Sequence, residues 1–570
     1  QTSSSSIDSD LTRLREGAAV WAQLPPGDKA GVLLACRHLL GDCTAEWIEA
    51  AAAAKGLAGT PLAGEEAISG PWGVLRALEA YARTLQQIER FGGPRIDPRH
   101  VTVRPGGQVV ANVFPAGLAD RLLLDGVRAD VWMEPGVTPQ TLEQTMGTWY
   151  RQSAPKPKVA LVLGAGNIAS IAPLDVLYKL VADGSVCMLK MNPVNHYLGP
   201  IFERAFAPLV DAGFLRFAYG GADIGKYLCS HPLVDEIHIT GSDKTHDAIV
   251  FGDGPEGAER KRRNEPLLEK PITSELGNVS PTIVVPGPWS DADIAFQAEN
   301  VVTQKLHNDG FNCIAAQVLI LPAQWEHTAT FVAAVEKLLG ALPDRPAYYP
   351  GAAQRCDALA TGHAEVARFG RTDAGFVPRT LMRLDADAAD PALTTEAFCS
   401  LLGVVRLEGG VDTYLNDAVA FANERLRGTL GANLIVHPKT MRADAAAVDR
   451  AIADLRYGCI GVNAWTGVGF LLSDATWGAY PGHTLDDIRS GIGVVHNAML
   501  FSQPQKSVVY APFAPFPRSL FGYGATLLPK PPWFVTNGNQ AKIGKALCRF
   551  EISKSPLDLA KVAFLAMTAR

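Results

Sequence analysis

The chain has 570 residues, of which 47% are hydrophobic and 19% are charged. This length exceeds what one hydrophobic core organises, and the apolar content is too high for a disordered chain, so we expect at least two folded domains. The 52 basic and 58 acidic residues give a formal net charge of −6, which argues against electrostatic binding to nucleic acid or to an anionic membrane.

Nine cysteines occur in the chain, an odd number without a CxxC pair. This pattern indicates neither a disulfide framework nor a zinc site, and it fits a reducing compartment. The first residues, QTSSSSIDSDLTRLREG, are polar and acidic, unlike a signal peptide. The longest apolar stretch, 159–174, is interrupted by glycines and polar residues and is too short to span a bilayer. We therefore expect a cytoplasmic protein that does not enter a membrane.

The pattern of residue types changes twice in the first part of the chain. Apolar residues recur at helical spacing from residue 7 to about 100, which predicts a helical start. From 101 to about 135, β-branched residues alternate around Gly and Pro, and this pattern predicts strands or hairpins. Residues 138–153 are predicted to form a helix, followed by the linker APKPK.

From residue 158 to 241, strand and helix patterns alternate. This alternation predicts βαβ units and a parallel sheet. The charged stretch 252–266 is predicted to be a surface insertion whose basic run, 260–263, lies in a solvated loop, and the alternative is that this run binds a 2′-phosphate or an acidic substrate. A second α/β block covers about 277–475. Ser555 and Pro556 predict the start of a last helix.

A glycine-rich loop follows the first strand of the βαβ region. Residues 164–169, GAGNIA, match the GxGxxA pattern of dinucleotide-binding loops. That pattern also needs an acidic residue at the end of the next strand, about 20 residues further on. The chain has Lys190, Asn192 and Pro193 there and no carboxylate, which argues against an ordinary dinucleotide fold.

Five further strings, taken in chain order, resemble the aldehyde dehydrogenase superfamily: HPLVDEIHITGSDKT, SELGNVSP, HNDGFNCIAAQVL, TTEAFCSLLGV and GCIGVNAW. The resemblance covers about residues 155–500 and implies an α/β fold of two domains with parallel sheets and a β-rich oligomerisation element. It implies NAD(P)-dependent oxidation of an aldehyde to a carboxylic acid by a homodimer or homotetramer. The implied division is a cofactor-binding domain (1–100 and 155–276), a catalytic domain (277–475), oligomerisation segments (101–154 and 476–510) and a C-terminal extension (511–570).

The resemblance assigns the chemistry to three residues. Cys313 takes the place of the nucleophile. A cysteine suits this role because a thiolate attacks a carbonyl carbon and the resulting thioester is readily hydrolysed. Glu275 takes the place of the general base that activates the thiol or the deacylating water. Asn167 takes the place of the side-chain donor to the oxyanion, and it precedes Lys190 by the family's own spacing of 190 − 167 = 23 residues.

The resemblance also assigns residues to NAD or NADP. Lys190 is expected to bind the adenosine ribose, and Gly241 and Ser242 to place a helix N-terminus against the pyrophosphate. Glu396 and Phe398 are expected to hold the nicotinamide ribose and ring. Many relatives carry a ribose-binding Glu where this chain has Pro193, so a determinant that favours NAD over NADP is missing.

Two alternatives remain open from the sequence. A CoA-acylating aldehyde dehydrogenase or fatty acyl-CoA reductase usually lacks the general base, so Glu275 argues against it. A catalytically silent scaffold conflicts with the simultaneous presence of Cys313, Glu275, Asn167 and Lys190. The twelve histidines show no metal-ligand spacing, so no metal site is expected. Three apolar residues either line an aldehyde pocket or pack in the core: Phe311, Ile314 and Trp465.

Overall fold

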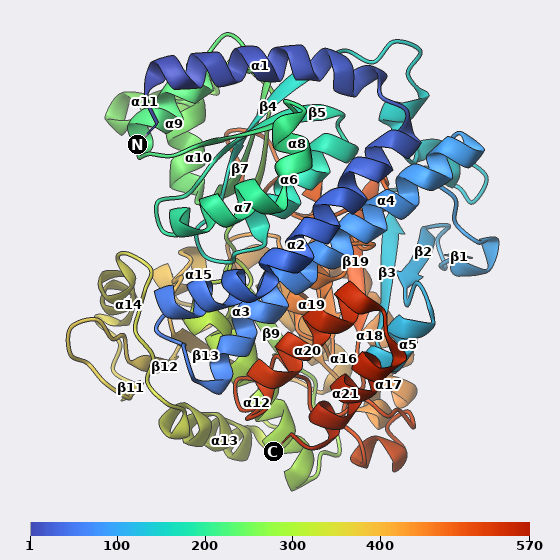
Figure 1. The fold of residues 1–570 in the computed structure, drawn as a ribbon. Helices are drawn as coiled ribbons and strands as arrows, with labels where there is room; N and C mark the ends of the chain where they lie inside the picture. The colour runs from blue at the N-terminus through green and yellow to red at the C-terminus, as the bar shows by residue number, and fades with distance from the viewer. Residues whose placement is uncertain (1, 570) are drawn as a thin grey trace.

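The computed structural model describes residues 2–569, which form two large β-sheets with helices packed against them (Figure 1). The first part of the chain is helical, as predicted, and the strands predicted between 158 and 241 are all present. The sheets meet so that loops from both surround the candidate site described below.

The smaller sheet has the strand order β17-β8-β7-β4-β5-β6, and its five strands from β4 to β8 run parallel. The chain builds β5 and β6 on one side of β4 and then returns to build β7 and β8 on the other side. Such a reversal leaves a crevice at the carboxyl ends of the central strands. The strands are β4 (Lys158–Leu163), β5 (Ser185–Lys190), β6 (Leu215–Ala218), β7 (Glu236–Gly241), β8 (Ile272–Leu276) and β17 (Gly491–Ile492).

The larger sheet has eleven strands in the order β1-β2-β3-β19-β15-β14-β9-β10-β13-β12-β11. Its centre is parallel, whereas β1, β2 and β3 join it through antiparallel pairing with β19. The strands are β1 (Val101–Val103), β2 (Val109–Phe114), β3 (Arg128–Met133), β9 (Ser280–Val284), β10 (Ala316–Pro322), β11 (Val366–Phe369), β12 (Arg379–Arg383), β13 (Leu401–Leu407), β14 (Gly431–Ile435), β15 (Cys459–Val462) and β19 (Pro504–Tyr510).

Most of the remaining helices cover the two sheets. Those that follow strands of the smaller sheet are α6 (Ile171–Val181), α7 (Gly199–Ala205), α8 (Ala207–Asp211), α9 (Ala222–Ser230), α10 (Asp243–Val250) and α11 (Gly254–Arg263). Those that accompany the larger sheet are α5 (Leu118–Leu123), α12 (Asp291–Leu306), α13 (Thr328–Ala341), α14 (Ala352–Ala360), α15 (Pro391–Thr394), α16 (Val411–Arg425), α17 (Pro438–Ala443), α18 (Ala445–Asp454) and α19 (Thr466–Leu471).

The later part of the N-terminal helical segment packs against the C-terminal helices. The N-terminal helices run from the smaller sheet down to the C-terminal helices, and α20 packs against α3 (Figure 1). Ser555 caps the last helix by accepting a hydrogen bond from the Leu557 amide, as predicted. These helices are α1 (Ser4–Gln23), α2 (Pro26–Ala54), α3 (Gly64–Ala67), the π-helical turn η2 (Ile68–Trp72), α4 (Gly73–Phe91), α20 (Gln540–Ser553) and α21 (Pro556–Met567).

Two predictions for single segments are wrong. Residues 138–153 form two short 3-10 turns instead of one helix, because Gly147 adopts a φ of 59° between them and Met146 pairs with Phe501. Residues 254–263 form the helix α11 instead of a loop, since Glu259 and Arg263 make an ion pair four residues apart at 2.7 Å.

The basic run within α11 is paired with carboxylates. Lys261 contacts Asp247 at 2.6 Å, Arg260 contacts Glu256, and Arg262 shares Glu259 with Arg263. None of these four basic residues lines the cleft described below. The run is therefore an ordinary solvated helix face in this structure.

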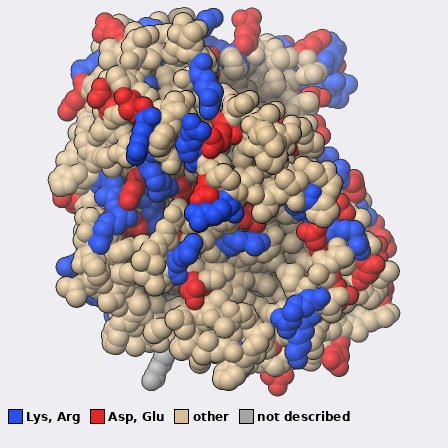
Figure 2. Space-filling view, turned by 90° about the vertical axis from the view of Figure 1, so that its right-hand side faces the viewer, with Lys and Arg blue, Asp and Glu red and all other residues tan. Residues whose placement is uncertain are grey.

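The surface mixes both signs of charge. On the face drawn in Figure 2, Lys and Arg are interspersed with Asp and Glu. Within residues 2–569, we find no helix with the length and apolarity needed to cross a bilayer.

Candidate active site

One cleft gathers every residue that the sequence analysis assigned to the site. It has a volume of about 1600 Å³ and lies at the carboxyl ends of β4, β5, β7 and β8, facing loops of the larger sheet. Its lining includes Asn167, Lys190, Gly241, Ser242, Glu275, Cys313, Glu396 and Phe398. Residues that are far apart in sequence therefore share one cavity.

Each of these residues lies at the end of an element. Lys190 and Gly241 are the last residues of β5 and β7, and Glu275 is next to last in β8. Asn167 lies in the loop between β4 and α6, where the predicted GAGNIA turn occurs. Cys313 lies in the loop before β10.

Cys313 differs from the other cysteines in its exposure. It is half-buried, whereas the remaining eight free cysteines are buried. Its thiol hydrogen-bonds to the Glu275 carboxyl, and burial together with the Glu275 charge raises its pKa well above the usual range. The resting side chain is therefore a neutral thiol with a proton acceptor in direct contact.

Glu275 is buried, with 4% of its surface exposed, and carries two uncharged hydrogen-bond donors. The Trp477 indole N–H donates to its Oε1 at 3.1 Å, and the Cys313 thiol is the second donor. Burial raises the pKa of Glu275 and the two hydrogen bonds lower it, and the resulting pKa is about 7. Such a group exchanges a proton readily near neutral pH.

Glu396 occupies the same cleft beside Gly277. Burial and then the charge of Glu275 raise its pKa to about 8. A Cβ at Gly277 would meet Glu396 Oε2 at 1.9 Å, so a larger residue there would push the Glu396 carboxyl out of this position. Phe398 follows two residues later and has a φ of 43°, which turns the chain back toward the core.

The other end of the cleft is suited to anions. Ser242 caps α10 by accepting a hydrogen bond from the Thr245 amide at 3.2 Å, so the helix N-terminus faces the cleft. Lys190 is buried, and this burial lowers its pKa. Further cations line the same wall: Lys226, Lys244, Lys270, Arg427 and Arg489.

A second, narrow cavity of about 30 Å³ lies on the other side of Cys313 and Asn167, which line both spaces. Its wall is mainly apolar and includes Ile68, Ile168, Ile314, Trp465, Phe470, Trp477 and Trp533. Ile314 and Trp465 thus line a pocket, whereas Phe311 is fully buried against Tyr348, Tyr349 and Phe398. His307 is also in the wall, and burial lowers its pKa to about 4.

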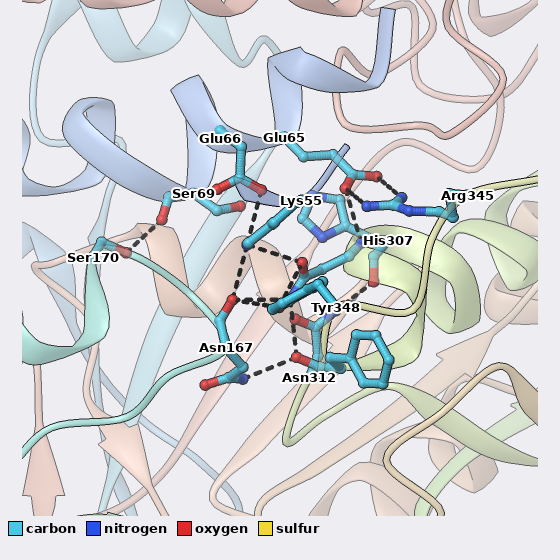
Figure 3. Close-up of polar contacts among 12 residues, drawn as sticks. Lys55, Glu65, Glu66, Ser69, Asn167, Ser170, His307, Asn312, Arg345 and Tyr348 are labelled. Atoms are coloured by element: carbon cyan, nitrogen blue, oxygen red, sulfur yellow. Dashed lines mark hydrogen bonds and ion pairs between the residues drawn. The ribbon is translucent and has the colours of Figure 1, made fainter. Parts of the chain in front are cut away.

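A buried polar cluster adjoins the cleft, and the sequence analysis did not find it (Figure 3). Lys55, the residue after α2, donates to Asn167 O at 2.9 Å and to Asn308 Oδ1 at 3.0 Å, and it pairs with Glu66 at 2.9 Å. Glu65 binds Arg345 through two hydrogen bonds of 3.0 and 3.1 Å. No motif marks these residues, because they become neighbours only through the fold.

The loop that carries Cys313 begins with three residues in the left-handed region. The φ values are 52° at Asn308, 56° at Asp309 and 79° at Gly310. Both the oxygen and the nitrogen of the Asn308 side-chain amide have hydrogen-bond partners. The backbone N–H of Asn308 donates to the Glu65 carboxylate at 3.0 Å. Side chains from distant segments therefore hold this backbone in an unfavourable conformation.

Comparison with known proteins agrees with this geometry. The model of the "Aldehyde dehydrogenase family" matches residues 159–470, more than half of the chain. The chain belongs to the aldehyde dehydrogenase family. The resemblance stated from the sequence is thereby confirmed. The match excludes the N-terminal helices, the segment 101–154 and the C-terminal extension.

Named aldehyde dehydrogenases are among the relatives. A geranial dehydrogenase of Castellaniella defragrans is 27% identical over 299 residues, which is 49% of this chain and 58% of that protein. A coniferyl aldehyde dehydrogenase of a Pseudomonas species is 27% identical over 191 residues, which is 33% of this chain and 36% of that protein. The chain thus matches less than two thirds of the length of these relatives.

Solved aldehyde dehydrogenase structures share the fold over most of the chain. An aldehyde dehydrogenase of Mycobacterium tuberculosis, solved with NAD+, has a TM-score of 0.61 at 19% identity and covers 89% of this chain and 90% of its own. A Pseudomonas syringae aldehyde dehydrogenase mutant, solved with NAD+ and octanal, has a TM-score of 0.59 at 19% identity and covers 90% of both chains. The predicted α/β fold is confirmed, whereas the domain boundaries and the oligomerisation role of 101–154 and 476–510 stay predictions.

Proposed function

We propose that this chain oxidises a neutral, apolar aldehyde to the carboxylic acid with NAD or NADP as the electron acceptor. One observation carries the proposal. Cys313, the half-buried cysteine, lies in contact with Glu275 where a cofactor-sized cleft adjoins a narrow apolar cavity. A nucleophile at this junction can reach an aldehyde from one side while a cofactor occupies the other.

The residues of the cleft fit a dinucleotide. The N-terminus of α10 and the cations along the wall provide amides and positive charge for a diphosphate. Lys190 ends β5 and Asn192 follows it by two residues, and both would face a ribose, while Glu396 and Phe398 would hold the nicotinamide end. The bound nicotinamide would supply the hydride acceptor, which no side chain can replace.

The side chains supply nucleophile, proton acceptor and oxyanion donor. Glu275 accepts the thiol proton as Cys313 adds to the aldehyde carbon. The Asn167 amide donates one hydrogen to Phe311 O at 2.9 Å, which leaves its second hydrogen for the oxyanion. Once Glu275 has released the thiol proton to solvent and the thioester has formed on Cys313, Glu275 takes a proton from the water that releases the acid.

The apolar cavity favours a neutral substrate. No Lys, Arg, Asp or Glu is among the described residues that line it, and His307 is neutral at physiological pH because of its lowered pKa. A charged aldehyde would lose its hydration there without gaining a partner. The relatives named for geranial and coniferyl aldehyde, both uncharged, fit this chemistry better than those named for aminoaldehydes.

The test is formation of reduced cofactor from neutral aldehydes with NAD and with NADP, with and without CoA. Cys313→Ala should abolish turnover and leave cofactor binding within about threefold, and iodoacetamide should label Cys313 before the other cysteines. Cys43→Ala, which removes a buried thiol far from the site, is the matched control. Activity above a few per cent in the Cys313 variant, or strict dependence on CoA, would contradict the proposal.

A further inference from the structure

The carbonyl oxygen of Asn167 receives three hydrogen bonds. The donors are Lys55 Nζ at 2.9 Å, Tyr348 OH at 2.9 Å and Asn308 Nδ2 at 3.1 Å. A carbonyl oxygen has two lone pairs, so these donors saturate it and fix the plane of the peptide that follows Asn167. In Figure 3 the Lys55 side chain descends from the N-terminal helical segment onto this loop.

Lys55 brings a buried charge to this point. Only 4% of its side chain is exposed, and its three donors go to Asn167 O, Asn308 Oδ1 and Glu66 Oε1. The Glu66 carboxylate, equally buried, balances the ammonium charge. A charge-assisted bond to a peptide oxygen is stronger than a neutral one, so Lys55 contributes more to this orientation than Tyr348 does.

The oriented peptide sets the direction of the Asn167 side chain. The Asn167 amide donates to Phe311 O, and Asn308 Nδ2 donates to the same oxygen at 3.0 Å. Phe311 precedes Cys313 by two residues, so these bonds connect the loop after β4 to the loop that carries the thiol. The relative placement of the oxyanion donor and the nucleophile thus depends on this cluster.

We infer that Lys55, held by Glu66, is a positioning residue that aims the Asn167 side-chain amide at the oxyanion formed on the substrate of Cys313. Lys55 and Glu66 both lie outside residues 159–470, the part that matches the family model. Lys55 and Glu66 therefore take part in the chemistry from outside the lining of both cavities. This inference rests on the proposed function.

The primary test is a double-mutant cycle between Lys55→Met and Asn167→Ala. Loss of an oxyanion donor lowers kcat by roughly 10²- to 10³-fold. We expect Lys55→Met to lower kcat by about tenfold or more, with KM for the cofactor within about threefold. Because Lys55 acts through Asn167, adding Lys55→Met to Asn167→Ala should lower kcat by less than about threefold further.

Two controls separate positioning from damage to the fold. Lys29→Met removes another buried ammonium from α2, roughly 40 Å along the helix, where Lys29 packs on the Trp149 ring, and it should leave kcat unchanged. Lys55→Met leaves the buried Glu66 carboxylate without its ion-pair partner, which can prevent folding. The double variant Lys55→Met with Glu66→Gln removes that charge and replaces Lys55→Met in the test if the single variant does not fold. In all folded variants, the rate at which iodoacetamide alkylates Cys313 should stay within about threefold, since the thiol and Glu275 are untouched.

The outcomes distinguish this inference from the proposed function. Three results would overturn the inference and leave the proposed function standing. The first is an unchanged kcat in the Lys55 variants, and the second is a double variant whose loss of kcat equals the product of the two single losses. The third is alkylation of Cys313 that slows in step with kcat. Full activity in Asn167→Ala would instead overturn the proposed oxyanion role, and the inference with it.

Discussion

Glu275 combines burial with donors that favour its charged form. The Trp477 indole N–H and the Cys313 thiol both stabilise the carboxylate, while the surrounding apolar groups destabilise it more. The balance places its pKa at about 7, where the unperturbed group would titrate near 4.5. The Cys313 thiol and the Trp477 indole thus hold the pKa of the proton acceptor below the value that burial alone would give.

This balance predicts a pH dependence. The protonated carboxyl cannot accept the thiol proton, so kcat/KM should rise with pH and level off above about 7. Trp477→Phe removes a donor to the charged form, which should raise the pKa and move the rise to higher pH by about one unit. Assays of reduced-cofactor formation from about pH 5 to about pH 9 would measure the pH at which kcat/KM rises in both proteins.

The comparison variant is Glu275→Gln, which removes the ionisation itself. The low residual kcat/KM of this variant should no longer rise with pH near 7. A rise that persists there in Glu275→Gln, or that moves to lower pH in Trp477→Phe, would show that another group controls the profile.

At the scale of elements, the C-terminal extension contributes to the candidate substrate cavity. Trp533 lines the cavity behind Cys313 although it lies beyond the family match, and Ile68 of η2 lines the same wall. At about 30 Å³ the cavity is narrow, so a smaller side chain in its wall should admit longer substrates. The extension and η2 therefore limit which aldehydes fit.

Trp533→Ala should enlarge this cavity and shift the preference toward longer aldehydes. We expect kcat/KM for a ten-carbon relative to a three-carbon straight-chain aldehyde to rise by about tenfold, which corresponds to the burial of about two further CH₂ groups at about 0.8 kcal/mol each. Phe521→Ala removes an aromatic ring of the same extension at a position that is 78% exposed, and it should leave the ratio unchanged. An equal ratio in both variants would remove Trp533 from the substrate site.

At the scale of the whole molecule, the cleft lies between the two sheets and is lined by loops of both. A ligand that bridges such a cleft stabilises the folded chain by mass action, by about 2.7 kcal/mol at 100 times its Kd. The end of β5, where Asn192 lines the cleft, carries no acidic group to repel a 2′-phosphate. Pro193 is exposed and lies outside the lining.

We therefore predict that NAD and NADP both raise the thermal unfolding midpoint. Asn192→Asp adds one negative charge at nearly constant shape, so it should reduce the shift caused by NADP more than the shift caused by NAD. Pro193→Glu should act in the same direction but less strongly, because the position is exposed. Differential scanning fluorimetry measures both, and equal shifts in parent and Asn192→Asp would show that other residues contact the ribose.

The sequence predicted the parts of the molecule whose signals are local. Strand and helix periodicity located the βαβ region, and the strings around Cys313 and Glu275 named residues that the fold brings into one cleft. The two wrong predictions had different causes. Residues 138–153 are shaped by the φ of 59° at Gly147 and by the pairing of Met146 with the distant Phe501, whereas α11 is stabilised by local ion pairs such as Glu259–Arg263 that the expectation of a loop overlooked. Lys55 carries no local signal, because Asn167 and Asn308, to which it donates, are more than a hundred residues away in the sequence.

The left-handed run from Asn308 to Gly310 also bears on how the chain folds. Its partners come from the N-terminal segment with Lys55 and Glu65, from Asn167 and from Tyr348, so the loop reaches its final shape only after these three segments have docked. Contacts between such distant residues form late, because loop closure must precede them. Helices and sheets can therefore be complete while the thiol and its oxyanion donor are still unaligned. A newly made chain would acquire its fold first and its chemistry last.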